Sequence, residues 1–149
     1  MEVATVLESA RAEVLEEACE ALDRAHLKHY PASPRSRQHL ETLLDLVAEC
    51  LKRRTLIPIS SYAQGVAQQR FDSGFEIAEV QTAFNVVEEA IWHVVIARLP
   101  ADCLIEAAGL VGTVLGAGKD ALARTWVSLA AGEHVTSLDL TALFEGAAS

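Results

Sequence analysis

The sequence predicts an all-α fold, a single-domain bundle of about five helices followed by a short C-terminal helix. Apolar residues recur at alternating steps of three and four along most of the chain, which is the spacing of one helix face. Four prolines, at positions 31, 34, 58 and 100, fall between these periodic stretches. No stretch alternates like a β-strand, and 149 residues suffice for one domain with its own core over residues 1–149.

A proline-rich segment separates the first two expected helices. The pattern predicts a first helix over residues 3–28, which the following Pro31 and Pro34 bring to an end. Ser36 can cap a second helix, because its hydroxyl can accept a hydrogen bond from a free backbone N–H of the first turn. The basic residues 52–54 close this helix, where cations suit the negative end of the helix dipole.

A third, shorter helix and a glycine turn are expected next. After a break at residues 56–59, Ser60 or Ser61 can cap a helix that ends near Asp72. Gly74 follows, and glycine readily adopts the left-handed conformation that terminates many helices.

Residues 76–99 are expected to form the fourth and most apolar helix. One apolar seam has heptad-like spacing and further apolar residues lie on the other sides, so this helix should occupy the middle of the bundle. The seam comprises Ile77, Val80, Phe84, Val87, Ile91 and Val94, and the additional apolar residues are Ala83, Val86, Ala90, Trp92, Val95 and Ile96.

The fifth expected helix, over residues 101–131, contains four glycines. Gly109, Gly112, Gly116 and Gly118 each cost about 1 kcal/mol relative to alanine in a helix interior. A close contact or a kink could explain their presence, and we expect close packing against the fourth helix. The apolar run 103–118 is shorter than the ~20 residues that span a membrane, so we interpret it as a buried bundle helix. The tail, residues 132–149, should form a short docked helix.

Composition argues against several classes of partner and site. The net charge of −9 disfavours nucleic acid, because binding to phosphates requires clustered Lys and Arg. Cys19, Cys50 and Cys103 are far apart and odd in number, which suggests neither a disulfide framework nor a zinc site. Glu2 and Glu8 are unlike the basic start of a signal peptide. We expect a soluble cytoplasmic protein without a membrane segment.

Histidines are the candidate cofactor ligands. His26 and His29 are three residues apart, but they lack a third ligand, and we interpret them as surface or helix-end cations. His93 lies on the most apolar helix, and a histidine borne by a bundle helix is a common haem ligand. His93 is therefore the candidate cofactor residue, although most such histidines are core or boundary residues. Glu89 precedes it by four residues, one more than the Glu-x-x-His motif of di-iron proteins.

Arg70 and Glu79 flank the turn at Gly74 and have two possible interpretations. They could be solvated charges, or an ion pair that braces the two helices and is worth at most about 1 kcal/mol if it is exposed. Alternatively, Arg70 could project into a ligand pocket. No nucleophile elbow, phosphate-binding loop or metal motif is present in the sequence, and we expect no enzymatic activity.

One pattern in the chain is shared with a known family. It consists of a short helix ending in arginine, a glycine turn, a hydrophobic-x-x-Glu-Val restart and a long helix with a tryptophan, and it covers residues 59–63, 67–80 and 90–92. With this pattern the chain resembles the N-terminal sensor domain of RsbT co-antagonist proteins over about residues 28–130. The matching signature positions are Arg70, Gly74, Glu79 and Trp92, for which structural roles suffice.

This resemblance implies a helical input domain of bacterial signalling. In that family the domain usually precedes a STAS domain or another output module, and related proteins hold a switch kinase in a large stressosome complex. Here only about twenty residues follow Leu129, so we expect a stand-alone member, an excised domain, or a different protein with the same bundle.

Two functional hypotheses follow. The first is a non-enzymatic signalling module that acts through contacts with itself, as a homodimer, or with a signalling partner. The alternative is a small-molecule or haem sensor with a globin-like or bundle pocket near His93, lined by the helices at 76–99 and 101–131.

Overall fold

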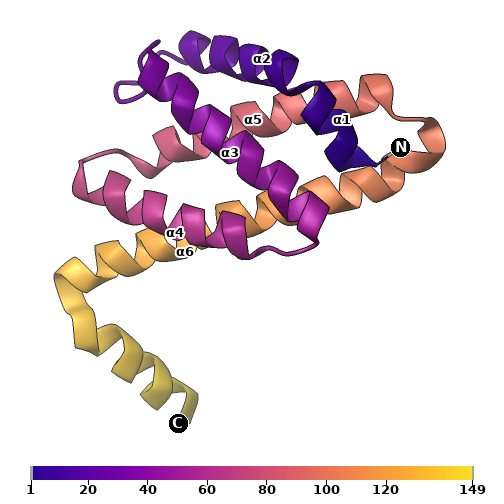
Figure 1. The fold of residues 1–149 in the computed structure, drawn as a ribbon. Coiled ribbons are helices and arrows are strands. Elements are labelled where there is room, and N and C mark those ends of the chain that lie inside the picture. The colour runs from indigo at the N-terminus through magenta and orange to yellow at the C-terminus, as the bar shows by residue number, and fades with distance from the viewer. Residues whose placement is uncertain (1, 149) are drawn as a thin grey trace.

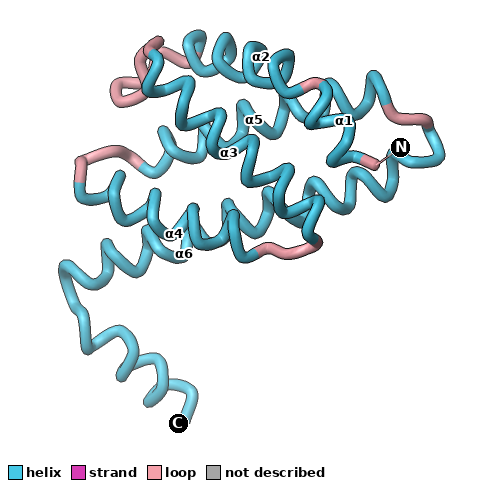
Figure 2. The backbone as a smooth tube through the Cα atoms, viewed as in Figure 1, coloured by secondary structure: helices cyan, strands magenta, loops and turns pink. Residues whose placement is uncertain are grey.

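Six helices make up the fold (Figures 1 and 2). The computed structural model describes the backbone of residues 2–148 and the side chains of residues 2–132. The helices are α1 (Val3–Ser9), α2 (Arg11–Arg24), α3 (Pro34–Arg53), α4 (Ile57–Asp72), α5 (Ile77–Arg98) and α6 (Ala101–Ala148). Residues 2–148 contain no strand, and the predicted all-α bundle is confirmed.

The first predicted helix is divided in two at Ala10. The backbone there leaves helical geometry, with φ −101° and ψ 11°, while hydrogen bonds still join Ala10 N to Val6 O and Val14 N to Ala10 O. Ala10 is itself buried, and the bend lets α1 and α2 both turn apolar residues into the same core. The prediction of one continuous helix over residues 3–28 is therefore wrong. The apolar spacing is the same before and after the bend, so it does not reveal the bend.

The starts of α3 and α4 also differ from the expectation. Ser33, not Ser36, caps α3: its hydroxyl accepts a hydrogen bond from the backbone N–H of Ser36, and Pro34 occupies the first turn. Helix α4 begins at Ile57, with Pro58 in its first turn. Proline suits that position because the first N–H groups of a helix have no partner within the helix. Pro34 and Pro58 therefore lie inside the first turns of α3 and α4, whereas the sequence predicted that both helices begin after these prolines.

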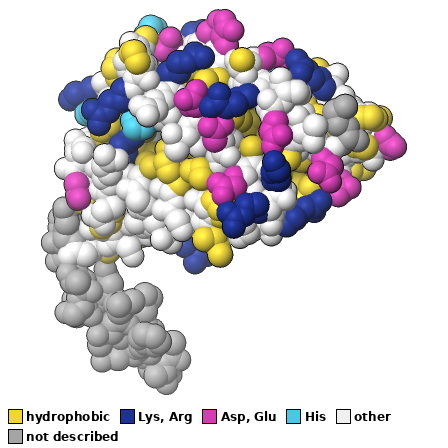
Figure 3. All heavy atoms as spheres, viewed as in Figure 1, with side chains coloured by type: hydrophobic (Ala, Val, Ile, Leu, Met, Phe, Trp, Pro, Cys, Tyr) yellow, Lys and Arg dark blue, Asp and Glu magenta, His cyan; other side chains and the backbone are white. Residues whose placement is uncertain are grey.

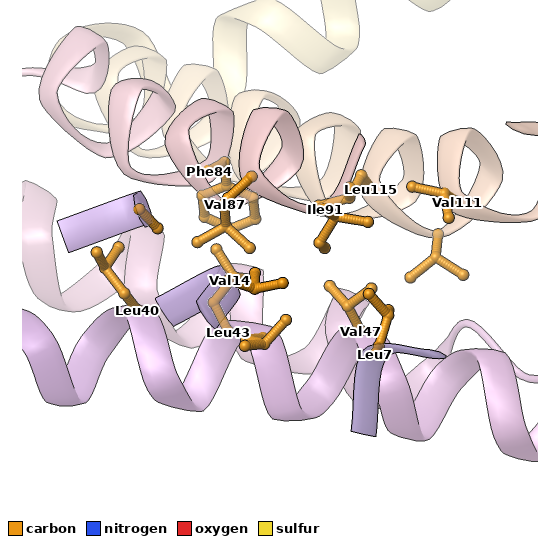
Figure 4. Close-up of a cluster of buried hydrophobic side chains, with 14 of the residues drawn as sticks. Leu7, Val14, Leu40, Leu43, Val47, Phe84, Val87, Ile91, Val111 and Leu115 are labelled. Carbon is orange, nitrogen blue, oxygen red and sulfur yellow. The ribbon is translucent and has the colours of Figure 1, made fainter. Parts of the chain in front are cut away.

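Helix α5 lies at the centre of the bundle, as predicted. Its buried side chains contact α1, α2, α3 and α6. Figure 4 shows Phe84, Val87 and Ile91 among core side chains that come from α1, α2, α3 and α6. The start of α5 is held by a reciprocal capping box, in which Glu76 and Glu79 each accept from the other's backbone N–H.

Helix α6 is one continuous element instead of a fifth helix followed by a separate short one. It packs on α3, α4 and α5 through a single face, whose buried residues are Ala107, Val111, Val114, Leu115, Gly118 and Leu122. The buried bundle helix predicted for residues 103–118 is therefore buried on one face only. The docking predicted for the tail concerns side chains beyond Gly132, which lie outside the described residues.

The segment Ala101–Gly132 is the one helix of the described residues that is long and apolar enough to cross a membrane. Its most apolar window of 18 residues has a mean hydropathy of 1.4, and 28% of the residues in that window are buried in the bundle. A bundle helix with one buried face meets the same criterion of length and composition.

Of the four glycines between positions 109 and 118, one packs as predicted. A Cβ atom at Gly118 would stand 3.0 Å from Ile59 and 3.1 Å from Phe84, so glycine permits close contact with α4 and α5 there. A Cβ at Gly109, Gly112 or Gly116 would meet no atom of the described residues within 4 Å. The close packing expected at these three positions is wrong, because they lie on the side of α6 that faces away from the bundle.

Candidate functional site

Charged and aromatic side chains gather where the α2–α3 loop, the start of α3, the end of α4 and the start of α5 meet. Figure 3 shows Lys, Arg and His side chains grouped at the end of the molecule that carries the α2–α3 loop. In the part of the chain with described side chains, Arg70 and Glu79 of this cluster are the two buried charged residues.

The turn between α4 and α5 places Phe75 against Arg70. Gly74 has a φ of +83°, which a residue with a side chain rarely adopts. The backbone N–H of Phe75 donates to the carbonyl of Arg70 at 3.0 Å, and that of Gly74 donates to Phe71 at 3.2 Å. This is the hydrogen-bond pattern with which many helices end in glycine. It brings the Phe75 ring centroid to 5.1 Å from the Arg70 guanidinium carbon.

The Arg70 guanidinium is buried among neutral partners. Its residue is 3% exposed. Nε donates to the Tyr30 hydroxyl at 3.3 Å, Nη1 donates to Gln69 Oε1 at 2.7 Å, and Nη2 lies 3.0 Å from Nε2 and 3.1 Å from Nδ1 of His39. No carboxylate of the described residues forms an ion pair with it. A buried cation held by neutral acceptors retains its full charge and can attract an anion.

Glu79 is bound separately from Arg70. Its carboxylate accepts the backbone N–H of His29 at 2.9 Å and that of Glu76 at 3.0 Å, and it lies 2.8 Å from His29 Nδ1. Burial disfavours the charged carboxylate, but these hydrogen bonds and the His29 ring together lower the pKa of Glu79 below its ordinary value. The bracing ion pair with Arg70 considered from the sequence is therefore wrong, and Glu79 instead ties α5 to the α2–α3 loop.

Aromatic contacts join the two charged groups into one cluster. The His29 ring stacks on Phe75 with centroids 4.4 Å apart, and Tyr30 meets Phe75 edge to face at 5.5 Å. Tyr30 also meets the His39 ring edge to face at 6.2 Å. Residues from three separated stretches of the chain thus hold the Arg70 side chain in one orientation.

A surface cleft of about 390 Å³ opens beside Arg70. Its lining includes two arginines and two histidines, namely Arg35, Arg70, His29 and His39, and no acidic residue of the described chain. Pockets of about 300–1,000 Å³ are typical of small-molecule sites. The ligand pocket considered for Arg70 from the sequence has a geometric counterpart in this cleft.

His39 should make stability depend on pH. Burial first, and then the charges of Arg70 and Arg35, lower the pKa of His39 below its ordinary 6.5. The unfolded chain therefore takes up a proton at higher pH than the folded chain, so the free energy of unfolding should fall as pH falls below 6.5, by at most about 1.4 kcal/mol per pH unit. Urea unfolding between pH 7 and 5 measures this slope. The His39→Gln variant, which keeps an acceptor for Arg70, should have a shallower slope, and an equal slope in both proteins contradicts the assignment to His39.

The structure places His93 on the surface, at the edge of the α2–α5 contact. Its side chain is 56% exposed, with Nδ1 at 2.8 Å from Glu17 and Nε2 at 3.9 Å from Glu89. The hollow beside it measures about 170 Å³, less than a typical small-molecule pocket. Trp92, the preceding residue, is half-buried against the core. Neither His26 nor His29 belongs to a candidate metal site. Residues with described side chains contain no group of three or more His, Cys, Asp or Glu placed to hold a metal ion.

Tyr30 and His39 are partners of Arg70 that the sequence pattern does not reveal. They are 40 and 31 residues away from it in the chain, and nothing in their local sequence indicates the contact. One partial signal was available, because Ser36 and His39 are one turn apart and share a face at the start of α3.

No protein-family model, curated protein or solved structure matches this chain.

Proposed function

We propose that the chain is a non-enzymatic signalling module of the bacterial cytoplasm that acts through protein–protein contacts, as a homodimer formed by the outer face of α6. The observation that carries this proposal is the row of helix-interior glycines at 109, 112 and 116, where an added Cβ would meet no other helix of the described chain within 4 Å. The resemblance to the RsbT co-antagonist sensor domain supports the signalling role, and the self-association rests on the geometry of α6.

The outer face of α6 consists mainly of small and apolar residues, with the exposed Asp120 at its edge. Its residues recur at steps that keep them on one side of the helix, opposite the buried face. We call this set the glycine face: Ile105, Gly109, Gly112, Gly116, Ala123 and Val127. Ile105 is 86% exposed and Val127 is 65% exposed, so large apolar side chains flank the glycines in open solvent.

The glycines indicate a helix as the partner. Each costs about 1 kcal/mol in a helix interior, and no contact within the described chain compensates for Gly109, Gly112 or Gly116. Small residues let two helix backbones approach closely, which yields many favourable contacts between them. Contacts with a second helix on this face would offset the cost of the glycines.

Charge placement favours a second copy of α6 in antiparallel orientation. Glu106 and Arg124 are eighteen residues apart, which is five full helical turns, so both exposed side chains lie on one flank of the glycine face. Within the chain Arg124 Nε lies 2.9 Å from Asp120 Oδ2, an exposed pair that leaves the guanidinium able to contact a second carboxylate. An antiparallel pair related by a two-fold axis near position 115 places Glu106 of each chain opposite Arg124 of the other. A parallel pair would place like charges opposite each other.

Replacing Gly112 with leucine should dissociate the dimer. A leucine at this position has open space within the described chain, but it would hold the two α6 helices apart. Light scattering at micromolar concentration should give twice the 16.0 kDa chain mass for the wild type and a shift toward the single mass for the variant. We expect the dimer dissociation constant to increase at least about tenfold.

Gly65→Leu is the matched control, because Gly65 is also exposed and has no neighbour within 4 Å, but it lies on α4. It should leave the dimer unchanged. Glu106→Arg and Arg124→Glu should each weaken the dimer, and the double exchange should restore it. If the wild type is monomeric, or if it associates only with neutral lipid vesicles, the proposed function is excluded. If the wild type is a dimer that Gly112→Leu does not weaken, the proposed interface is excluded.

A further inference from the structure

Arg70 is a buried cation without an anion. The chain carries 21 acidic residues against 12 Lys and Arg, yet no carboxylate of the described residues pairs with this guanidinium. The buried carboxylate nearest in the cluster, Glu79, is held by two backbone N–H groups and the His29 ring. A desolvated charge normally acquires a counter-ion, and the cleft beside Arg70 is where one can reach it.

Gln69 occupies the place of that anion. Its Oε1 lies 2.7 Å from Arg70 Nη1, and its side chain is on the surface and lines the same cleft. A neutral amide oxygen is a weaker acceptor for a guanidinium than an anionic oxygen. An anion can therefore displace the Gln69 amide without disturbing the buried contacts to Tyr30 and His39.

Two further features make the cleft electropositive. Arg35 lines it from the first turn of α3, is exposed and forms no ion pair with the described residues. The cleft also borders Ser33 and Ser36, where α3 begins, and the start of a 20-residue helix contributes partial positive charge. Burial and the two arginines lower the pKa of His39, which reflects the same positive surroundings.

We propose that this cleft binds the phosphate group of a small phosphorylated molecule, with Arg70 and Arg35 as the cationic contacts and the Gln69 amide as the group that is displaced. Two guanidinium groups match the two charges of a phosphate monoester better than the single charge of a carboxylate. The volume of about 390 Å³ leaves room for a small organic group beside the phosphate. This site does not depend on dimer formation through α6.

Titration with inorganic phosphate at constant ionic strength tests the site. The arginine Nε signals of Arg70 and Arg35 in NMR spectra should shift saturably, with a dissociation constant in the millimolar range, while acetate and chloride at equal concentrations should shift them far less. Calorimetry of the same titration should give the same constant. Absence of a saturable shift at up to about 50 mM phosphate overturns the proposal, and acetate binding as tight as phosphate overturns the choice of phosphate.

Two surface variants test the residues without removing the buried arginine. Arg35→Gln should weaken phosphate binding about tenfold. Gln69→Glu supplies an internal carboxylate at the position of the displaced amide and should weaken binding by at least the same factor. Arg37→Gln, two residues further along α3 and outside the cleft lining, is the matched control and should change the constant by less than about twofold. An equal loss in Arg35→Gln and Arg37→Gln indicates general charge attraction and overturns the site.

Discussion

Replacing Phe84 with alanine should lower the free energy of unfolding by about 3–5 kcal/mol. Phe84 heads the fully buried side chains by volume, and Figure 4 shows it beside Val87 in the buried cluster. Removing its ring loses apolar burial and leaves a cavity between α5 and α6, because the neighbouring backbones relax only in part. Urea unfolding monitored by circular dichroism measures the loss, and a loss below about 1 kcal/mol contradicts this packing.

Gly118 supplies the control for this prediction through a double-mutant cycle. Gly118→Leu alone should destabilise by about 1–3 kcal/mol or more, because its side chain enters space occupied by Ile59 and Phe84. In the Phe84→Ala background the same leucine has room, so its cost should fall by at least about 1 kcal/mol. Gly65→Leu, on an open helix surface, should add its effect independently of Phe84. Simple additivity of Gly118→Leu and Phe84→Ala excludes direct contact between the two positions.

Replacing Glu79 with alanine should lower the free energy of unfolding by about 3 kcal/mol. The change removes the acceptor for the backbone N–H groups of His29 and Glu76 and for the His29 ring, and it frees the α2–α3 loop from α5. Chemical denaturation measures the stability, and amide exchange at His29 should accelerate because its backbone N–H loses its partner.

The dependence of the free energy of unfolding on pH, measured at acidic pH, provides a second test of Glu79. Its folded pKa lies below the ordinary 4.5, so its contribution is present above that value and is lost as pH falls through the folded pKa. In the Glu79→Gln variant, the free energy of unfolding should fall less steeply over this acidic pH range. Glu76→Ala, which removes only the exposed half of the capping box, should cost about 1 kcal/mol. Equal losses for Glu76→Ala and Glu79→Ala show that the link to His29 contributes nothing.

Local sequence was sufficient for most helix ends and for the central position of α5. Pro100 follows α5, and Gly74 takes the left-handed conformation that its place after α4 predicts. The errors occurred where one local signal fits two structures. Proline can follow a helix or begin one, and Pro34 and Pro58 both begin helices. The bend at Ala10 preserves the apolar spacing on both sides and therefore leaves no trace in the pattern.

The candidate cleft was predictable only in part. Arg70 and Glu79 were identified from their positions around the turn, where an ion pair between them was one of the interpretations that the sequence allowed. Their actual partners come from the α2–α3 loop and from α3, and Glu79 is fifty residues away from His29. His93 was favoured because it follows Trp92 on the most apolar helix, yet it occupies the exposed edge of that helix.

The sequence by itself determined the helices, because the spacing of apolar residues and the conformational preferences of proline and glycine act within a few turns of the chain. Only the tertiary structure decided which face of each helix is covered. Helix α6 carries apolar or small residues on two sides, and the pattern is the same whether a side meets α4 and α5 or faces solvent. The contacts that distinguish the two sides join residues far apart in the chain. For the same reason, only the fold revealed that Arg70 is buried without a carboxylate beside a cleft.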